Sequence, residues 1–133
     1  MQDAINKFGP LAGRILLSLI FLLSGINKIG GFAGTAGWMT SKGMPMAEVL
    51  LAITIVIEIG ASLMIIGGYK ARLGAAALFL WMIPVTFAFH NFWAAADAAK
   101  QIEMIMFMKN LGLMGGMLYI MAFGSGPMSI DKK

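Results

Sequence analysis

Four long apolar runs restrict the fold of this chain more than any other feature of its sequence. They cover about residues 11–29, 46–67, 73–90 and 102–123. A helix of that length measures about 27–33 Å at 1.5 Å per residue, close to the ~30 Å hydrocarbon core of a bilayer. The apolar residues form unbroken runs and do not alternate with polar ones, which favours helices over the strands of a barrel. The sequence therefore predicts an all-α membrane protein, a bundle of four transmembrane helices.

The composition agrees with a membrane protein. Apolar residues make up 59% of the chain, charged residues make up 12%, and the mean hydropathy is +0.85. A soluble domain is about 45–50% apolar and about 25% charged. So few charges could not cover a core of this apolarity in water. We expect residues 1–133 to form a single membrane domain.

Glycine and proline mark several ends of these runs: positions 30–31 follow the first, 43–45 precede the second, 67–68 follow the second and 124–127 follow the fourth. The connection between the first two runs carries Phe32, Trp38 and Met39 among glycines, which is typical of a segment in the membrane interface. The first run could alternatively be a cleaved signal peptide. Within it, the uncharged apolar stretch 15–26 is preceded by Arg14 and followed by Lys28, which favours a helix that is retained.

Four spans place both chain termini on one side of the membrane. That side carries six of the basic residues and the opposite side carries three: Lys7, Arg14, Lys70, Arg72, Lys132 and Lys133 against Lys28, Lys42 and Lys100. Basic residues are enriched in cytoplasmic loops. Both termini are therefore predicted to be cytoplasmic.

Several classes of site are excluded by residue type. The chain has no cysteine, which excludes disulfides, thiolate metal sites and a cysteine nucleophile. With one histidine, no metal site is expected. The 13 methionines could suggest copper(I), but Met104, Met106 and Met108 cannot share a helix face, and methionine is a common packing residue. The scattered basic residues give no nucleic-acid-binding surface.

The most informative polar residue is Glu58, near the middle of the second run. An unpaired carboxylate at that depth costs several kcal/mol, so it is expected to be paired, protonated or hydrated. Lys109 lies about two turns inside the fourth run and Arg14 about one turn inside the first. We predict a buried Arg14–Glu58–Lys109 network, with Asn27 and Asn110 beside it. The network could fix helix register, or it could bind a polar or anionic group or carry protons.

An aromatic segment containing His90 and Trp93 ends the third run. The favoured interpretation of aromatic residues at the end of a span is a belt at the membrane interface. A histidine beside aromatic rings is also suited to contact a quinone ring.

The polar and glycine motifs occur in a recognisable order. They are Arg14, 21–28 (FLLSGINK), 57–60 (IEIG), 67–72 (GGYKAR), 89–93 (FHNFW) and 107–116 (FMKNLGLMGG). This set resembles the DoxX family over about residues 10–123. The resemblance implies a small prokaryotic inner-membrane protein that associates with oxidoreductases. One relative is a subunit of a thiosulfate:quinone oxidoreductase, and a distant eukaryotic relative is a cargo receptor. Because the chain has no cysteine, direct thiol exchange is not expected.

We therefore expect a membrane subunit of a larger oxidoreductase or respiratory complex that presents a quinone or small-anion pocket. Glu58 would balance charge or relay protons, Lys109 and Arg14 would position an anionic or carbonyl group, and His90 and Trp93 would line the mouth. No intrinsic redox cofactor is encoded, so electrons would come from a partner and the chain would not catalyse alone. One alternative is an assembly subunit or homo-oligomer without a ligand. Another is a small transporter or proton pathway centred on Glu58.

Overall fold

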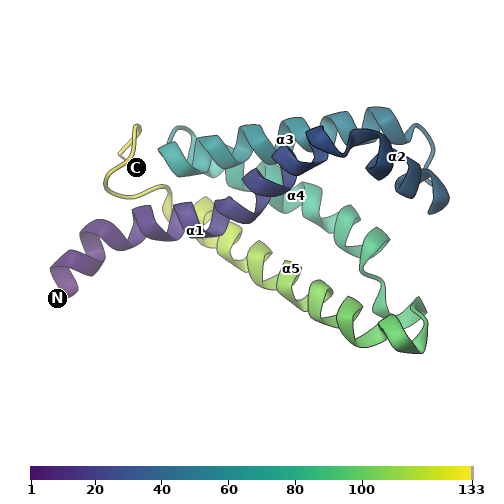
Figure 1. Ribbon diagram of the computed structural model, residues 1–133. Coiled ribbons are helices and arrows are strands. Elements are labelled where there is room, and N and C mark those ends of the chain that lie inside the picture. Colours follow the sequence, from purple (N-terminus) through teal and green to yellow (C-terminus); the bar gives the residue numbers. More distant parts are fainter. Residues whose placement is uncertain (133) are drawn as a thin grey trace.

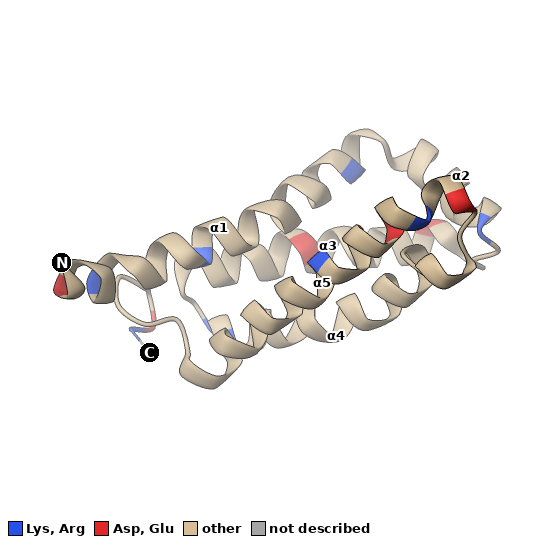
Figure 2. Cartoon of the chain, turned by 90° about the horizontal axis from the view of Figure 1, so that it is seen from below, with Lys and Arg blue, Asp and Glu red and all other residues tan. Residues whose placement is uncertain are grey.

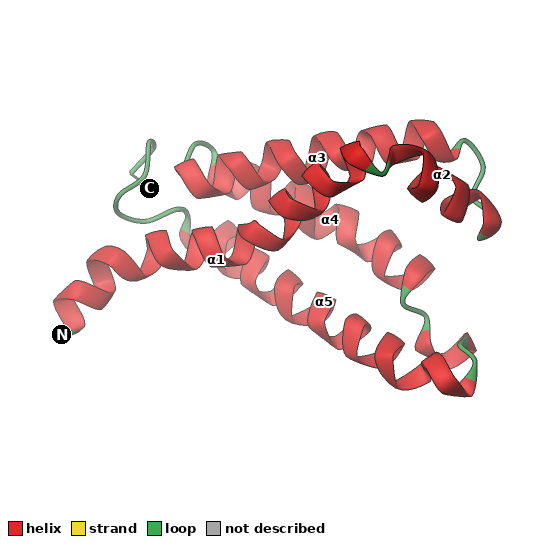
Figure 3. Ribbon diagram, viewed as in Figure 1, coloured by secondary structure: helices red, strands yellow, loops and turns green. Residues whose placement is uncertain are grey.

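The computed structural model describes residues 1–132 and is helical almost throughout (Figure 1). The elements are α1 (Gln2–Gly30), α2 (Phe32–Ser41), α3 (Ala47–Gly67), α4 (Ala71–Phe89), the short 3₁₀ helix η1 (Phe92–Ala94) and α5 (Asp97–Phe123). Short loops join them, and residues 1–132 contain no strand (Figure 3). Four segments are long and apolar enough to cross a membrane: α1, α3, α4 with η1, and α5. The predicted all-α fold with four membrane-spanning helices is confirmed.

The four long helices run in alternating directions, so both chain ends lie at the same end of the bundle (Figure 1). We call this the terminal end, and the opposite end, with α2 and η1, the distal end. Each expected span falls on one long helix, but α1 begins at Gln2, well before the expected start at Leu11. Residues 2–8 are exposed and include polar residues, so they carry no apolar signal, and Pro10 is accommodated inside the helix.

The connection between the first two spans forms a helix of its own. Ala36 and Met39 of α2 pack with Ala47 and Leu51 of α3 in a small buried cluster. The ring of Trp38 stacks on Phe89 at the end of α4, with 4.8 Å between centroids. α2 therefore covers the distal ends of α3 and α4.

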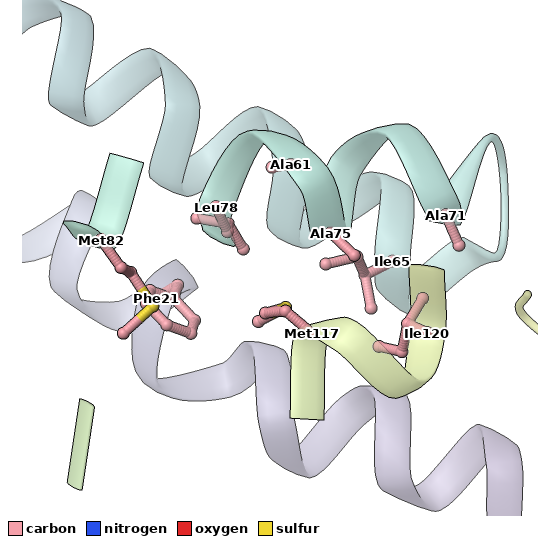
Figure 4. Close-up of a cluster of buried hydrophobic side chains, with 9 residues drawn as sticks. All are labelled: Phe21, Ala61, Ile65, Ala71, Ala75, Leu78, Met82, Met117 and Ile120. Carbon is pink, nitrogen blue, oxygen red and sulfur yellow. The ribbon is translucent and has the colours of Figure 1, made fainter. Parts of the chain in front are cut away.

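The main hydrophobic core joins all four long helices (Figure 4). Its buried residues are Phe21 of α1, Ala61 and Ile65 of α3, Ala71, Ala75, Leu78 and Met82 of α4, and Met117 and Ile120 of α5. Small residues let α3 and α4 approach closely, since a Cβ added at Gly74 would lie 3.0 Å from the carbonyl oxygen of Ala61.

Charged residues gather mainly towards the two ends of the bundle, with few between them (Figure 2). Glu58 lies near the middle of α3 and Lys109 near the middle of α5. These two charges lie deep in the apolar spans, where an unpaired charge is costly.

Candidate functional site

Glu58 forms an ion pair with Lys28. Its residue exposure is 6%, and its Oε1 accepts a hydrogen bond of 2.7 Å from Nζ of Lys28. The same ammonium donates to Oγ of Ser24, at 2.6 Å. The carboxylate is therefore paired with a positive charge, as the sequence predicted. Its partner is Lys28, which we expected only to mark the end of a span.

The direction of helical side chains explains this pairing. Side chains in a helix tilt towards its N-terminus. Lys28 is one of the last residues of α1, so its ammonium points back into the bundle and reaches Ser24 one turn earlier. Glu58 belongs to the antiparallel α3, so its carboxylate tilts towards the distal end, where Lys28 lies. The two side chains therefore converge.

Gly25 makes the close approach of α1 and α3 possible. A Cβ added at Gly25 would lie 2.7 Å from Cγ1 of Ile59 and 3.2 Å from Cβ of Glu58. A side chain here would separate the two helices where they carry Lys28 and Glu58. Gly25 is thus part of the scaffold that holds the ion pair.

Arg14 does not join Glu58, so the predicted three-residue network is wrong. Arg14 is 2% exposed and donates hydrogen bonds to the carbonyl oxygens of Ser125, Pro127 (3.3 Å) and Met128 (2.8 Å). Its side chain tilts towards the N-terminus of α1 and therefore away from Glu58. The predicted network was based on the distance along the helix axis and did not take the direction of the side chains into account.

Lys109 is not bonded to Glu58 either. Its Nζ lies 3.5 Å from Sδ of Met106, one turn earlier in α5, and the residue is exposed on its outer side. Asn110 is buried and donates a 3.0 Å hydrogen bond to Oγ1 of Thr86 in α4. Asn27 is exposed and lines a shallow groove on the surface, not the cavity described below.

A cavity of about 260 Å³ nevertheless brings Glu58, Lys109 and His90 to a common space. All five α-helices contribute to its wall. Its lining residues are Ile20, Phe21, Ser24, Lys28, Thr35, Trp38, Met39, Leu51, Thr54, Glu58, Leu78, Trp81, Met82, Val85, Phe89, His90, Lys109, Asn110 and Leu113. The wall is mainly apolar with a few polar groups, which is the usual make-up of a small-molecule site.

The wall of the cavity also contains an unsatisfied hydrogen-bond donor. Nε1 of Trp81 is buried and has no hydrogen-bond partner among the described residues. A buried donor without a partner costs about 1–3 kcal/mol. The nitrogen itself is covered by neighbouring atoms, so an acceptor atom in the cavity would reach it only after a local movement of side chains.

The two aromatic-segment residues expected at the mouth, His90 and Trp93, lie in different surroundings. His90 lines the cavity, and its Nδ1 lies 3.4 Å from Oε2 of Glu103, without hydrogen-bond geometry, so the two form an ion pair only when the imidazole is charged. Trp93 is exposed, packs against Phe87, Phe92 and Phe107, and does not line the cavity. It therefore belongs to an aromatic cluster beside the site.

Sequence reasoning missed Lys28, Ser24 and Trp81. Ser24 and Lys28 are four residues apart and therefore share a helix face, and Gly25 beside them indicates a close helix contact on that side. The pattern of Ser24, Gly25 and Lys28 could therefore have indicated from the sequence that Lys28 faces a neighbouring helix. The position of Trp81 depends on the bend and packing of α4 and has no comparable signal.

Comparison with known families identifies the chain. The DoxX family model matches residues 9–91. The chain belongs to the DoxX family. The match contains Lys28, Glu58 and His90 of this DoxX chain and ends before α5, which carries Lys109.

Relatives of this DoxX chain extend the similarity to nearly its full length. Inner membrane protein YqjF of Escherichia coli K12 is 35% identical, covering 96% of this chain and 93% of YqjF. Inner membrane protein YphA of the same strain is 32% identical, covering 92% and 88%. A Surfeit locus protein 4 homolog of Schizosaccharomyces pombe is 27% identical over 96% of this chain but only 38% of its own length. No solved structure matches the chain.

The relatives and the four apolar spans together show in which cell compartment the protein is found. This DoxX chain is a multi-pass protein of the inner membrane, and its long helices are surrounded by lipid.

Proposed function

We propose that this DoxX-family chain is a membrane subunit that binds the ring of a quinone-type lipid and works beside a partner oxidoreductase. The observation that carries the proposal is the mainly apolar cavity with the Lys28–Glu58 ion pair in its wall. A bundle that served assembly alone would be packed throughout, and a void beside a buried charge would only reduce its stability.

The size of the cavity supports a ring as the occupant. Pockets for drug-sized ligands measure about 300–1,000 Å³, and this cavity, at about 260 Å³, is slightly smaller. It is therefore suited to a ring, with the hydrocarbon tail of the lipid extending between helices into the bilayer.

The donors in the wall suit the oxygens of a quinone. Lys28 and Ser24 lie on α1, whereas Trp81 and Asn110 lie on α4 and α5, so donors are present on different sides of the cavity. The indole N–H of Trp81 is buried without a partner among residues 1–132, and a local movement of side chains would let it donate to a ring carbonyl. A bound quinone would accept electrons from the partner oxidoreductase. The chain itself would bind and orient the ring and exclude water from it.

Purification from native membranes tests the proposal. The protein is extracted in mild detergent, its bound lipids are identified by mass spectrometry, and co-purifying proteins are identified in parallel. We expect a stoichiometric quinone-type lipid together with an oxidoreductase subunit. A cofactor-free protein that purifies alone would contradict the proposal.

A matched pair of variants distinguishes binding in the cavity from lipid carried on the surface. Val85 lines the cavity, and Val85→Phe would fill part of it. Val56 is 70% exposed on α3, so Val56→Phe adds the same group outside the cavity. We expect Val85→Phe to purify without the quinone and Val56→Phe to retain it. Equal retention by the two variants would show that the lipid is bound elsewhere.

One observation favours a proton pathway as the second candidate. A groove on the outside of α1 shares Ile20, Ser24, Lys28 and Thr35 with the cavity, so polar groups lead from the surface towards Glu58. Proton flux into proteoliposomes tests this function. Flux that is present in the native protein and absent in Glu58→Ala would favour the pathway.

A further inference from the structure

The charges around the cavity do not balance. Lys28 and Glu58 neutralise one another through their 2.7 Å contact. Lys109 also lines the cavity, and among residues 1–132 no carboxylate lies within ion-pair distance of it. Its polar contact is the neutral sulfur of Met106, at 3.5 Å. Glu103, which is not among the lining residues, faces His90 at 3.4 Å. Among the lining side chains of residues 1–132, Lys109 is therefore a positive charge with no carboxylate paired to it.

Lys109 cannot readily escape to water. It lies seven residues beyond Ile102, where the apolar part of α5 begins, which corresponds to about 10 Å of helical rise. Its side chain tilts towards the distal end, which brings the ammonium nearer to that interface, but its backbone lies within the apolar span. A charged group at this depth is usually paired or marks a ligand pathway.

Lys109 lies at the lip of the cavity. The residue is exposed and lines the cavity, which is partly open. A ligand entering from the bilayer at this position would pass the ammonium first. Trp81 and Asn110, on α4 and α5, would then contact the part of the ligand that lies deeper.

We infer that the ligand is an amphipathic monoanion, a lipophilic ring that carries one acidic oxygen, and that Lys109 binds this oxygen. The inference rests on the proposed function and adds the charge of the ligand. An enolate, a phenolate or a ring carboxylate would each supply the missing counter-charge. A charge-assisted hydrogen bond to Lys109 would then favour the anion over a neutral ring of the same shape.

Tryptophan fluorescence provides a direct measurement of binding. Trp38 and Trp81 line the cavity and Trp93 does not, so Trp93→Phe leaves two reporters, both at the site. The protein in nanodiscs is titrated with a 2-hydroxy-3-alkyl-1,4-naphthoquinone, which is an anion at neutral pH, and with its neutral 2-methoxy ether. We expect the anion to bind about tenfold or more tightly, since a charge-assisted bond contributes about 1.5–3 kcal/mol.

Variants of Lys109 assign this preference to one residue. Lys109→Gln should abolish the preference for the anion, and Lys109→Arg should keep it. Lys100→Gln makes the same change of charge on an exposed position of α5 outside the cavity, so it should behave as the native chain. Circular dichroism and thermal unfolding of each variant verify that the fold is intact.

The outcomes separate this inference from the proposed function. If both probes bind equally in the native chain and in Lys109→Gln, the inference is overturned and the quinone-type pocket stands. If neither probe quenches the fluorescence, both fail. Decanoate is a third probe, an anion without a ring. If it competes as strongly as the hydroxynaphthoquinone, the ring is irrelevant and the proposed ligand class is wrong.

Discussion

At the scale of single residues, the partners of the Lys28–Glu58 pair are not equivalent. The carboxylate of Glu58 is 8% exposed, whereas the side chain of Lys28 is 27% exposed and also bonded to Ser24. Without Glu58, the flexible lysine can turn towards the distal interface. Without Lys28, the carboxylate stays buried and must become neutral or remain unpaired.

Lys28→Met should therefore destabilise the protein more than Glu58→Gln. We expect a loss of about 2–3 kcal/mol for Lys28→Met and about 1–2 kcal/mol for Glu58→Gln, below the values for a fully buried pair because Lys28 is partly exposed. Unfolding in detergent measures both. The double variant Lys28→Met, Glu58→Met should recover much of the loss, since no buried charge remains. The reverse order of the two single variants would contradict this account of the pair.

The need for a positive partner at Glu58 was evident from the sequence, but the identity of the partner was not. Burial of a carboxylate in an apolar run is a local property that the sequence displays. Helix direction and side-chain tilt place Arg14 away from Glu58. Lys109 is not its partner for a different reason: α5 packs mainly on α4, whereas α3 packs on α1, which carries Lys28. Lys28 was interpreted as a topology signal because its backbone lies at the end of a span, although its ammonium lies deeper.

At the scale of elements, the contact between α1 and α3 depends on the absence of a side chain at Gly25. Gly25→Ala would place a methyl group 2.7 Å from Cγ1 of Ile59, so one of the helices must shift. We expect a loss of about 1–3 kcal/mol in stability, typical of overpacking. In Gly25→Ala, weaker quinone binding should accompany the lower Tm, because Lys28 and Glu58 move apart.

Gly13→Ala is the matched control on the same helix. A Cβ at Gly13 meets no other atom within 4 Å, so this variant should keep or slightly raise the Tm. If Gly25→Ala leaves the Tm unchanged, as Gly13→Ala is expected to do, then α1 and α3 are not in close contact at Gly25.

The segment after α5 is held across the terminal end by Arg14 and by the α3–α4 turn. Ile130 N and Asp131 N donate to the carbonyl oxygens of Gly67 and Gly68, and Asp131 Oδ2 accepts from the Lys70 amide. Gly68 has φ +71°, and a Cβ there would collide with Ser129. The burial of Arg14 is thus explained by the anchoring of this tail.

Arg14→Lys should release the tail even though it keeps the charge. A single ammonium cannot reproduce the planar fork of donors that Arg14 directs at three carbonyl oxygens. We expect proteinase K, which has broad specificity, to remove the C-terminal residues several times faster than from the native protein, as measured by mass spectrometry. Lys7→Arg, on the exposed first turns of α1, is the control and should leave the rate unchanged.

At the scale of the whole molecule, the number of spans and the shared side of the termini were predictable because apolar length alone determines them. The helix α2 and the polar start of α1 were not, because neither has the length or apolarity of a span. A pocket at Glu58, Lys109 and His90 was expected from the sequence, but its other lining residues were not, since the cavity lies where five helices meet and its shape depends on their packing.

The orientation of the bundle is a further prediction at this scale. The excess of basic residues at the terminal end predicts a cytoplasmic location for both termini. A green fluorescent protein fused to the C-terminus should therefore fluoresce, and alkaline phosphatase fused at the same place should be inactive. Active phosphatase with a dark fluorescent protein would show the opposite orientation.

An experimental density map of the protein in nanodiscs with a bound hydroxynaphthoquinone would show the cavity, the ion pair and the ligand together. We expect ring-shaped density in the cavity, with Lys28 still bonded to Glu58 and Lys109 within hydrogen-bond distance of an oxygen of the ring. A cavity filled by repacked side chains, or a Glu58 carboxylate that points into the lipid away from Lys28, would contradict this expectation.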